Sequence, residues 1–155
     1  MVNKKKLSSL ADKFRAALLL TEPTDFVGTS LSASKFPDAC CDDASMLLAA
    51  YLVDNGFAEV DIIRGDNGGN EKELPSHVWL QVGDIQVDIT ADQFNQFGYR
   101  NSALICEENN IFLNSFSAQN AGCADFREHV PQYNDPDLFA AFESGYETIK
   151  SKLKA

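Results

Sequence analysis

The sequence has few basic residues, few cysteines and no long apolar run, and each of these features excludes a class of protein. Its 13 lysine and arginine residues are outnumbered by 23 acidic residues, which gives a net charge of −10. Binding to a phosphate backbone needs clustered basic side chains, so we expect no nucleic-acid partner. No stretch approaches the roughly 20 apolar residues that span a bilayer, so we expect a soluble protein with no membrane association.

The chain has only four cysteines, at positions 40, 41, 106 and 123. They form no C-x-x-C pair and no Cys/His ligand spacing, which argues against a structural zinc site. A disulfide between the adjacent Cys40 and Cys41 would be strained. We therefore expect reduced thiols in a cytoplasmic protein that holds no metal and no organic cofactor.

What the chain does contain is typical of a single globular domain that covers residues 1–155. Hydrophobic residues make up 45% of the sequence, and it shows no internal repeat or low-complexity segment. A chain of this length can bury roughly two-thirds of its unfolded surface in one core. The sequence leaves the oligomeric state open.

The first 20 residues carry a basic cluster, Lys4-Lys5-Lys6, followed by an apolar stretch. A secretory signal would need an unbroken apolar segment, but Asp12, Lys13 and Arg15 interrupt it. Apolar residues recur instead at helical spacing, on one face of the segment. They are Leu7, Leu10, Phe14 and Leu18. We predict an amphipathic helix packed on the core.

Helical and strand patterns divide the rest of the sequence into an α+β order. We predict a central helix over residues 41–55, stopped by Asn55-Gly56, and a closing amphipathic helix over residues 137–153. The other predicted elements are a strand over residues 58–64, a glycine-rich mobile surface loop over 65–70, and short strands over 103–106 and 111–113.

A β-hairpin is predicted where residues 77–82 and 85–89 flank a Gly83-Asp84 turn, because a two-residue turn fixes the pairing of the strands. One face then carries aliphatic residues, and the other carries a polar set with one tryptophan, which we do not expect to be a second core face. The aliphatic pairs are Val82 with Ile85, Leu80 with Val87 and Val78 with Ile89, and the polar-face pairs are Gln81 with Gln86, Trp79 with Asp88 and His77 with Thr90.

The polar face of this hairpin places an acid near a histidine. Diagonal neighbours on paired strands lie within side-chain reach, so we expect Asp88 to accept a hydrogen bond from His77. A carboxylate on one imidazole nitrogen fixes the tautomer and leaves the other nitrogen free to take a proton. A solvent-facing sheet surface without any chemistry is the alternative. The competing acid and histidine, Asp92 and His129, are expected at the surface.

A cysteine pair lies where the loop of residues 36–40 runs into the predicted central helix. The unpaired N–H groups at a helix start favour a thiolate and can bind a developing oxyanion. Two alternatives remain: free cysteines are commonly small buried residues, and Asp42 and Asp43 suit a helix start structurally while opposing a thiolate.

The order of a helix-start cysteine, a strand histidine and an acid on the paired strand is similar to that of the transglutaminase-like superfamily, which is related to papain. The resembling segments are Ala39-Cys40-Cys41, Asn55-Gly56-Phe57, Ser76-His77-Val78-Trp79-Leu80 and Val87-Asp88-Ile89-Thr90, within residues 36–94. Val78 and Ile89 depart from the family's usual Ala and Pro. The resemblance implies an α+β core with the nucleophile at the start of a central helix packed on a small antiparallel sheet.

This resemblance assigns Cys41 as nucleophile, in preference to Cys40, with His77 as general base and Asp88 as the residue that orients the histidine. Neither Thr24 nor Ser34 matches an upstream oxyanion-hole motif, so the hole is unassigned. We expect a cysteine-dependent hydrolase acting on a peptide or protein amide through a thioester. The alternatives are an acyl transferase, or a non-catalytic domain that binds a protein partner through the Gly68-Gly69 loop and its acidic surface. Residues from Asn109 onwards are expected to shape the substrate cleft or its lid.

Overall fold

The structure, a computed structural model, describes residues 2–32, 36–38 and 40–153, which form an α+β fold with one five-stranded antiparallel sheet. The α-helices are α1 (Lys4–Leu19), α2 (Cys41–Asp54), α3 (Ile111–Asn114), α4 (Phe126–His129) and α5 (Pro136–Leu153). The strands are β1 (Asp61–Gly68), β2 (Leu74–Val82), β3 (Ile85–Asp88), β4 (Ile105–Glu107) and β5 (Ser117–Cys123). Short 3₁₀ turns cover Pro23–Phe26, Ser30–Ser32, Ala91–Phe97 and Val130–Tyr133.

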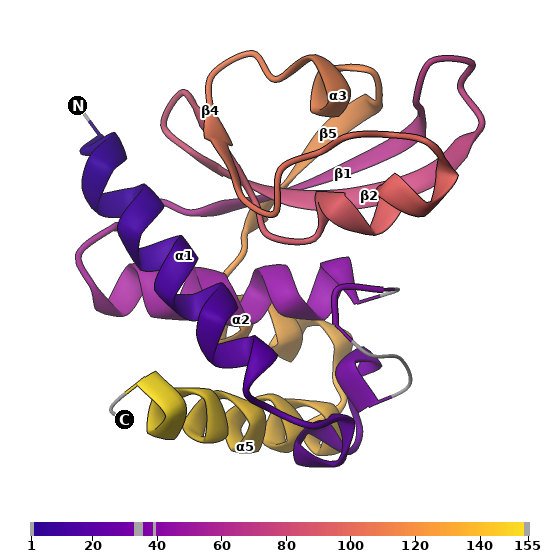
Figure 1. The fold of residues 1–155 in the computed structure, drawn as a ribbon. Coiled ribbons are helices and arrows are strands. Elements are labelled where there is room, and N and C mark those ends of the chain that lie inside the picture. Colours follow the sequence, from indigo (N-terminus) through magenta and orange to yellow (C-terminus); the bar gives the residue numbers. More distant parts are fainter. Residues whose placement is uncertain (1, 33–35, 39, 154–155) are drawn as a thin grey trace.

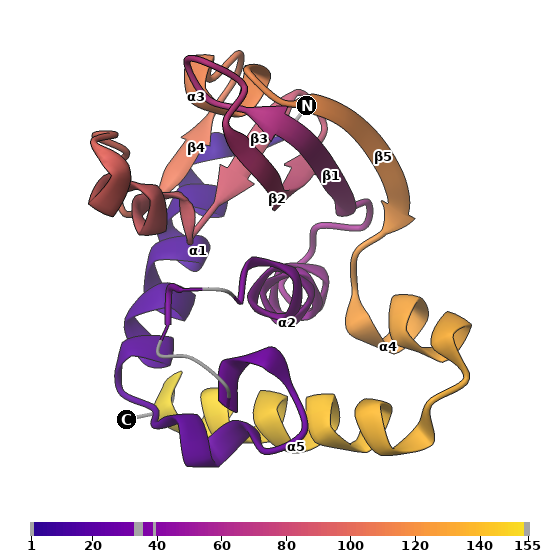
Figure 2. The ribbon, with the colours of Figure 1, turned by 90° about the vertical axis from the view of Figure 1, so that its right-hand side faces the viewer.

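Helix α2 lies at the centre of the fold, as the sequence predicted. Figure 1 shows the sheet above α2 and α5 below it, and the view along the helix axis in Figure 2 shows α1 and α4 on its two sides. Every residue from Ala44 to Ala50 is buried, and so is Leu52. Because a helix that is buried all round has no face for solvent, it must be covered on every side. This central position fixes the start of α2, with Cys41, beneath the sheet.

The two outer helices also agree with the sequence patterns. Leu7, Phe14 and Leu18 of α1 are buried against the core, and Leu10 is half-buried. Helix α5 starts one residue before the predicted closing helix and ends where that prediction ends. Among the residues that the structure describes, no helix combines the length and the apolar character needed to cross a membrane.

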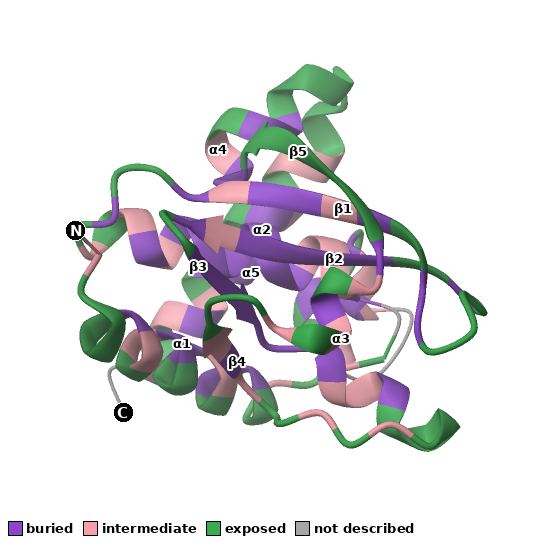
Figure 3. Ribbon diagram, turned by 90° about the horizontal axis from the view of Figure 1, so that it is seen from above, coloured by how far each residue is buried: buried purple, intermediate pink, exposed green. Residues whose placement is uncertain are grey.

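The sheet has the strand order β4-β3-β2-β1-β5, with the hairpin β2–β3 beside its centre. Val82 pairs with Ile85, Gln81 with Gln86 and Leu80 with Val87, which confirms the register predicted from the Gly83-Asp84 turn. Strand β3 ends at Asp88, so the predicted strand was one residue too long. Figure 3 shows β2 and β3 largely buried, whereas the edge strand β5 is exposed along its whole length.

Two local predictions were wrong, and one strand was missed. Residues 111–113 lie in helix α3, whose start is capped by the Asn110 side chain, and not in a strand. The glycine-rich segment 65–70 is not a surface loop throughout, because β1 continues to Gly68. Glycine is needed at positions 65 and 68 of this strand because a side chain at either position would overlap Phe116. The strand β5 was not predicted at all.

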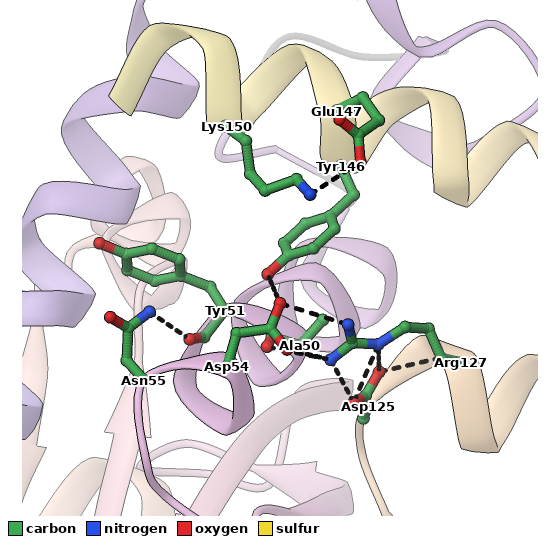
Figure 4. Close-up of polar contacts among 9 residues, drawn as sticks. All are labelled: Ala50, Tyr51, Asp54, Asn55, Asp125, Arg127, Tyr146, Glu147 and Lys150. Atoms are coloured by element: carbon green, nitrogen blue, oxygen red, sulfur yellow. Dashed lines mark hydrogen bonds and ion pairs between the residues drawn. The ribbon is translucent and has the colours of Figure 1, made fainter. Parts of the chain in front are cut away.

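A polar cluster holds the end of α2 against the two helices that follow the sheet (Figure 4). Arg127 of α4 donates to the Asp54 carboxylate at 2.9 Å and to Asp125 at 2.7 Å, and the Tyr146 hydroxyl of α5 donates to Asp54 at 2.6 Å. Burial acts in the opposite direction, but the bonds from Arg127 and Tyr146 lower the pKa of Asp54. The last turn of α2 is therefore fixed to α4 and α5.

Candidate functional site

The start of α2 presents one accessible thiol and one buried thiol. Cys41 is the first residue of the helix and is half-buried, whereas Cys40 directly before it is 1% exposed. Burial, together with the nearby Cys41, Asp43 and Asp38, raises the pKa of the Cys40 thiol to about 12. Cys41 is therefore the thiol of this pair that can react from solvent. Ala39 and Ser34, which entered the sequence comparison above, lie outside the described residues.

His77 and Asp88 form a buried pair between β2 and β3, as the turn geometry predicted. The His77 Nε2 atom lies 2.5 Å from an Asp88 carboxylate oxygen, and the two side chains are 0% and 1% exposed. The other Asp88 oxygen accepts bonds from the Thr90 N–H at 2.8 Å and from the Thr90 hydroxyl at 3.2 Å. Both carboxylate oxygens are thus engaged, which fixes the position of the acid and, through it, of the imidazole.

Aromatic rings enclose the His77 imidazole. Its centroid lies 4.9 Å from the ring of Phe94, 5.8 Å from Trp79, 5.9 Å from Phe116 and 6.4 Å from Phe112. These rings belong to a second hydrophobic cluster, separate from the main core around α2. The prediction that this face of the hairpin is not a second core face was therefore wrong: later segments of the chain cover it and exclude water from the histidine.

The Cys41 sulfur and the His77 ring influence each other. Nε2 is engaged by Asp88, and the buried Nδ1 has no aligned hydrogen-bond partner among the described residues. Burial alone would lower the pKa of His77, but the charge and hydrogen bond of Asp88, and then those of Cys41, raise it well above its usual value. Cys41 thus contributes to the raised pKa of His77 although no hydrogen bond joins the two side chains, and catalytic hydrogen bonds are often loose in unliganded sites.

Two acidic residues follow the thiol in the first turn of α2. Asp42 follows Cys41 and forms an ion pair with Arg64 of β1, with N–O distances of 3.0 and 3.3 Å. Arg64 also donates to the Tyr133 hydroxyl at 3.3 Å. Asp43 accepts a hydrogen bond from the Ser30 N–H at 2.7 Å. Both acidic residues of the first helical turn are thus held by neighbours.

The two competing residues are not simple surface groups. His129 is 5% exposed, with Nδ1 3.0 Å from the Cys123 carbonyl oxygen and Nε2 2.9 Å from the Tyr133 hydroxyl, so its expected surface location was wrong. It is buried because α4 packs under the end of β5. Asp92 is half-buried and pairs with Arg15 at 2.7 Å. Neither residue contacts Cys41 or His77 through any bond found among the described residues.

Two hollows of the described structure lie away from the thiol. One, of about 720 Å³, is bounded by the start of α1, the loop after α2 and the Gly83-Asp84 turn. The other, of about 480 Å³, lies beside α3 and shares Phe112 with the wall around His77. The described residues contain no group of three or more His, Cys, Asp or Glu side chains arranged to hold a metal ion.

Sequence reasoning missed several residues that shape the site. Thr90 could have been found, since an acid two residues before a threonine often forms a local side-chain turn. Arg64 had no signal, because its partner is 22 residues earlier in the chain. Phe112 and Phe116 also had none, because only the folded chain brings them over the hairpin.

The structure combines an α+β fold, a half-buried cysteine at the start of the central helix and a buried histidine–carboxylate pair. Comparison with protein-family models, with curated proteins and with solved structures found no match for this chain. Its function is therefore inferred from the geometry of the site and from the sequence resemblance described above.

Proposed function

We propose that the chain is a cysteine-dependent hydrolase with a papain- or transglutaminase-like core, acting on a peptide or protein amide. The observation that carries this proposal is the His77–Asp88 pair, sealed from water and placed beside the accessible thiol at the start of α2. Burying a histidine and an aspartate is costly unless the pair is hydrogen-bonded. A pair whose free imidazole nitrogen is left beside a thiol suits proton transfer.

The first half-reaction forms a thioester. Asp88 accepts a bond from the Nε2–H of His77, and Nδ1 holds the proton given up by Cys41, so the resting pair is a thiolate beside an imidazolium, in keeping with the raised pKa of His77. The sulfur attacks the amide carbonyl carbon, a C–S bond forms, and the carbonyl electron pair moves to oxygen. The first N–H groups of α2 are suited to bind that oxyanion, since Cys40 caps the helix without a side-chain hydrogen bond. The C–N bond then breaks, and the amine leaves with the Nδ1 proton.

The second half-reaction releases the acyl group. Water gives a proton to His77 Nδ1 and attacks the thioester carbonyl, the C–S bond breaks, and the sulfur leaves as a thiolate beside the imidazolium. The products are a carboxylic acid and free Cys41. An amine in place of water would make the same site an acyl transferase. Hydrolysis is the simpler proposal because it needs no second binding site.

A labelling experiment tests the proposal. Iodoacetamide and an electrophilic peptide probe should modify Cys41 faster near neutral pH than they modify the exposed Cys123, and His77→Ala should slow Cys41 alone. Sites are assigned by peptide fragmentation, with Cys41→Ala as the blank. If Cys41 reacted no faster than a free thiol, and its rate were the same in His77→Ala, the hydrolase proposal would be excluded. The alternative of a non-catalytic binding domain would then be favoured.

A further inference from the structure

The residue after the proposed nucleophile carries a charge that opposes a thiolate. Asp42 lies in the first turn of α2, next to Cys41, and its side chain is 42% exposed. A negative charge a few ångströms from the sulfur disfavours ionisation of the thiol, while the helix N–H groups favour it. Asp43 is a second acidic residue of this turn, and its carboxylate accepts from the Ser30 N–H at 2.7 Å. A site that relies on a thiolate needs something to offset Asp42.

Arg64 is placed to supply that offset. It lies on β1 in the position that pairs with Val78, directly after His77 on β2. Its guanidinium holds both Asp42 oxygens, at 3.0 and 3.3 Å, in the two-pronged geometry that arginine forms with carboxylates. Burial acts against the charge, but Asp42, followed by Tyr133 and Cys41, raises the pKa of Arg64. The guanidinium is therefore bound to the carboxylate of the residue that follows the thiol.

Tyr133 and His129 hold the guanidinium in this position. His129 Nδ1 lies 3.0 Å from the Cys123 carbonyl oxygen, which can only accept, so Nδ1 donates to it and Nε2 is the acceptor of the neutral imidazole. The Tyr133 hydroxyl then donates to Nε2, and its oxygen accepts from Arg64. The hydrogen bonds thus run in one direction from Arg64 to the Cys123 carbonyl. One Arg64 nitrogen is thus held by Tyr133 as well as by Asp42 at the start of α2.

We propose that Arg64 is a positioning residue of the site, which cancels the charge of Asp42 and so allows Cys41 to ionise. This inference rests on the proposed function, because it concerns the reactivity of the same thiol. The charged and titratable groups around the thiol are His77 from β2, Arg64 from β1, Asp42 and Asp43 from α2, Cys40 and Asp38 from the preceding segment, and Tyr133 from the C-terminal part. Among these groups, Arg64 is the cation whose positive charge is present whether or not Cys41 is ionised.

The test is the pH dependence of Cys41 alkylation in a charge cycle. Arg64→Gln should raise the midpoint of alkylation, making the reaction about three- to tenfold slower below that midpoint, as expected for losing one partly screened charge. Asp42→Asn should shift the midpoint in the opposite direction. The double variant, which removes a neutral pair, should return close to the original protein. Each curve is corrected with the matching Cys41→Ala protein.

Arg127→Gln is the matched control. Arg127 has the same 36% side-chain exposure and also pairs with an acid of α2, but at Asp54, in the last turn. The two acids are about 18 Å apart along the helix, beyond the screening length at physiological salt. Arg127→Gln should weaken folding, as followed by thermal unfolding, without moving the alkylation midpoint. Arg64→Lys, which keeps the charge, should restore most of the alkylation rate.

The outcomes separate the two proposals. Opposite shifts that cancel in the double variant support the role of Arg64. If the Arg64→Gln midpoint equals that of the original protein or of Arg127→Gln, while Cys41 still depends on His77, Arg64 is only structural and the hydrolase stands. If the alkylation midpoint of Cys41 in the original protein equals that of a free thiol, and His77→Ala does not change it, both proposals are refuted.

Discussion

Replacing Asp88 with asparagine separates the charge of this acid from its shape. The side-chain oxygen of the introduced asparagine can still accept from the Thr90 N–H, as an Asp88 oxygen does at 2.8 Å. The amide NH₂ then faces His77 Nε2, which must become an acceptor, so the proton moves to Nδ1. In that tautomer, Nδ1 cannot take the proton of Cys41. We expect the reactivity of Cys41 to fall by about two to four orders of magnitude.

The same substitution has a defined effect on stability. Truncation to alanine leaves a buried histidine unpaired and should cost about 3–5 kcal/mol, whereas the isosteric Asp88→Asn should cost about 1–3 kcal/mol because its hydrogen bonds are rearranged and not all lost. Both groups are almost completely buried, so solvent does not screen the loss. Urea unfolding at neutral pH, followed by tryptophan fluorescence and circular dichroism, measures the difference.

The pH dependence distinguishes an ion pair from a neutral hydrogen bond. The folded-state pKa of His77 is raised above the value of about 6.5 for a free histidine. Between these values the folded chain holds a proton that the unfolded chain has lost, so the free energy of unfolding falls with pH, by at most about 1.4 kcal/mol per unit. The stabilisation is complete below about pH 6.5 and is lost as the pH rises through the folded-state pKa. Asp88→Asn should remove this slope. An unchanged slope would refute the assignment.

Further substitutions test the surroundings of the site. Gly65→Ala places a methyl group against Phe116 and Trp79, and thermal unfolding should show a loss of about 1–3 kcal/mol; unchanged stability would contradict the close packing. Cys40, with its pKa raised to about 12, should resist iodoacetamide in the folded protein and react after urea unfolding, as peptide mapping would show; native labelling would argue against its burial. Asp54→Asn should destabilise the protein at neutral pH, and the difference should vanish in acid as the pH falls through the lowered folded-state pKa of Asp54. A pH-independent difference between the melting curves would speak against the ion pair.

The elements that carry the proposed triad could be predicted because their signals are local. Helical spacing and the Asn55-Gly56 stop defined α2, and the two-residue turn fixed the hairpin register and hence the contact of His77 with Asp88. These signals extend over a few residues, so the sequence alone reveals them. The position of Cys41 at the helix start followed from the same pattern.

What could not be predicted depends on distant parts of the chain. Strand β5 contains small polar residues with low strand propensity, and it is a strand because β1 pairs with it. The second core around His77 joins β2 to Phe94 and Phe116, which have no shared period in the sequence. His129 lies in a polar segment and is buried by tertiary packing. In each case the partner segment decides the structure.

The unequal exposure of Cys41 and His77 bears on where protons can travel. Cys41 is only half-buried, while the His77 side chain is 0% exposed and enclosed by aromatic rings. A proton taken from the thiol therefore has no direct path to bulk water and stays stored on the ring. The way out is back toward the sulfur, where it meets whatever is bound there. In a hydrolase, this arrangement would make proton transfer depend on a bound substrate. The imidazolium would then protonate the leaving amine in preference to bulk water.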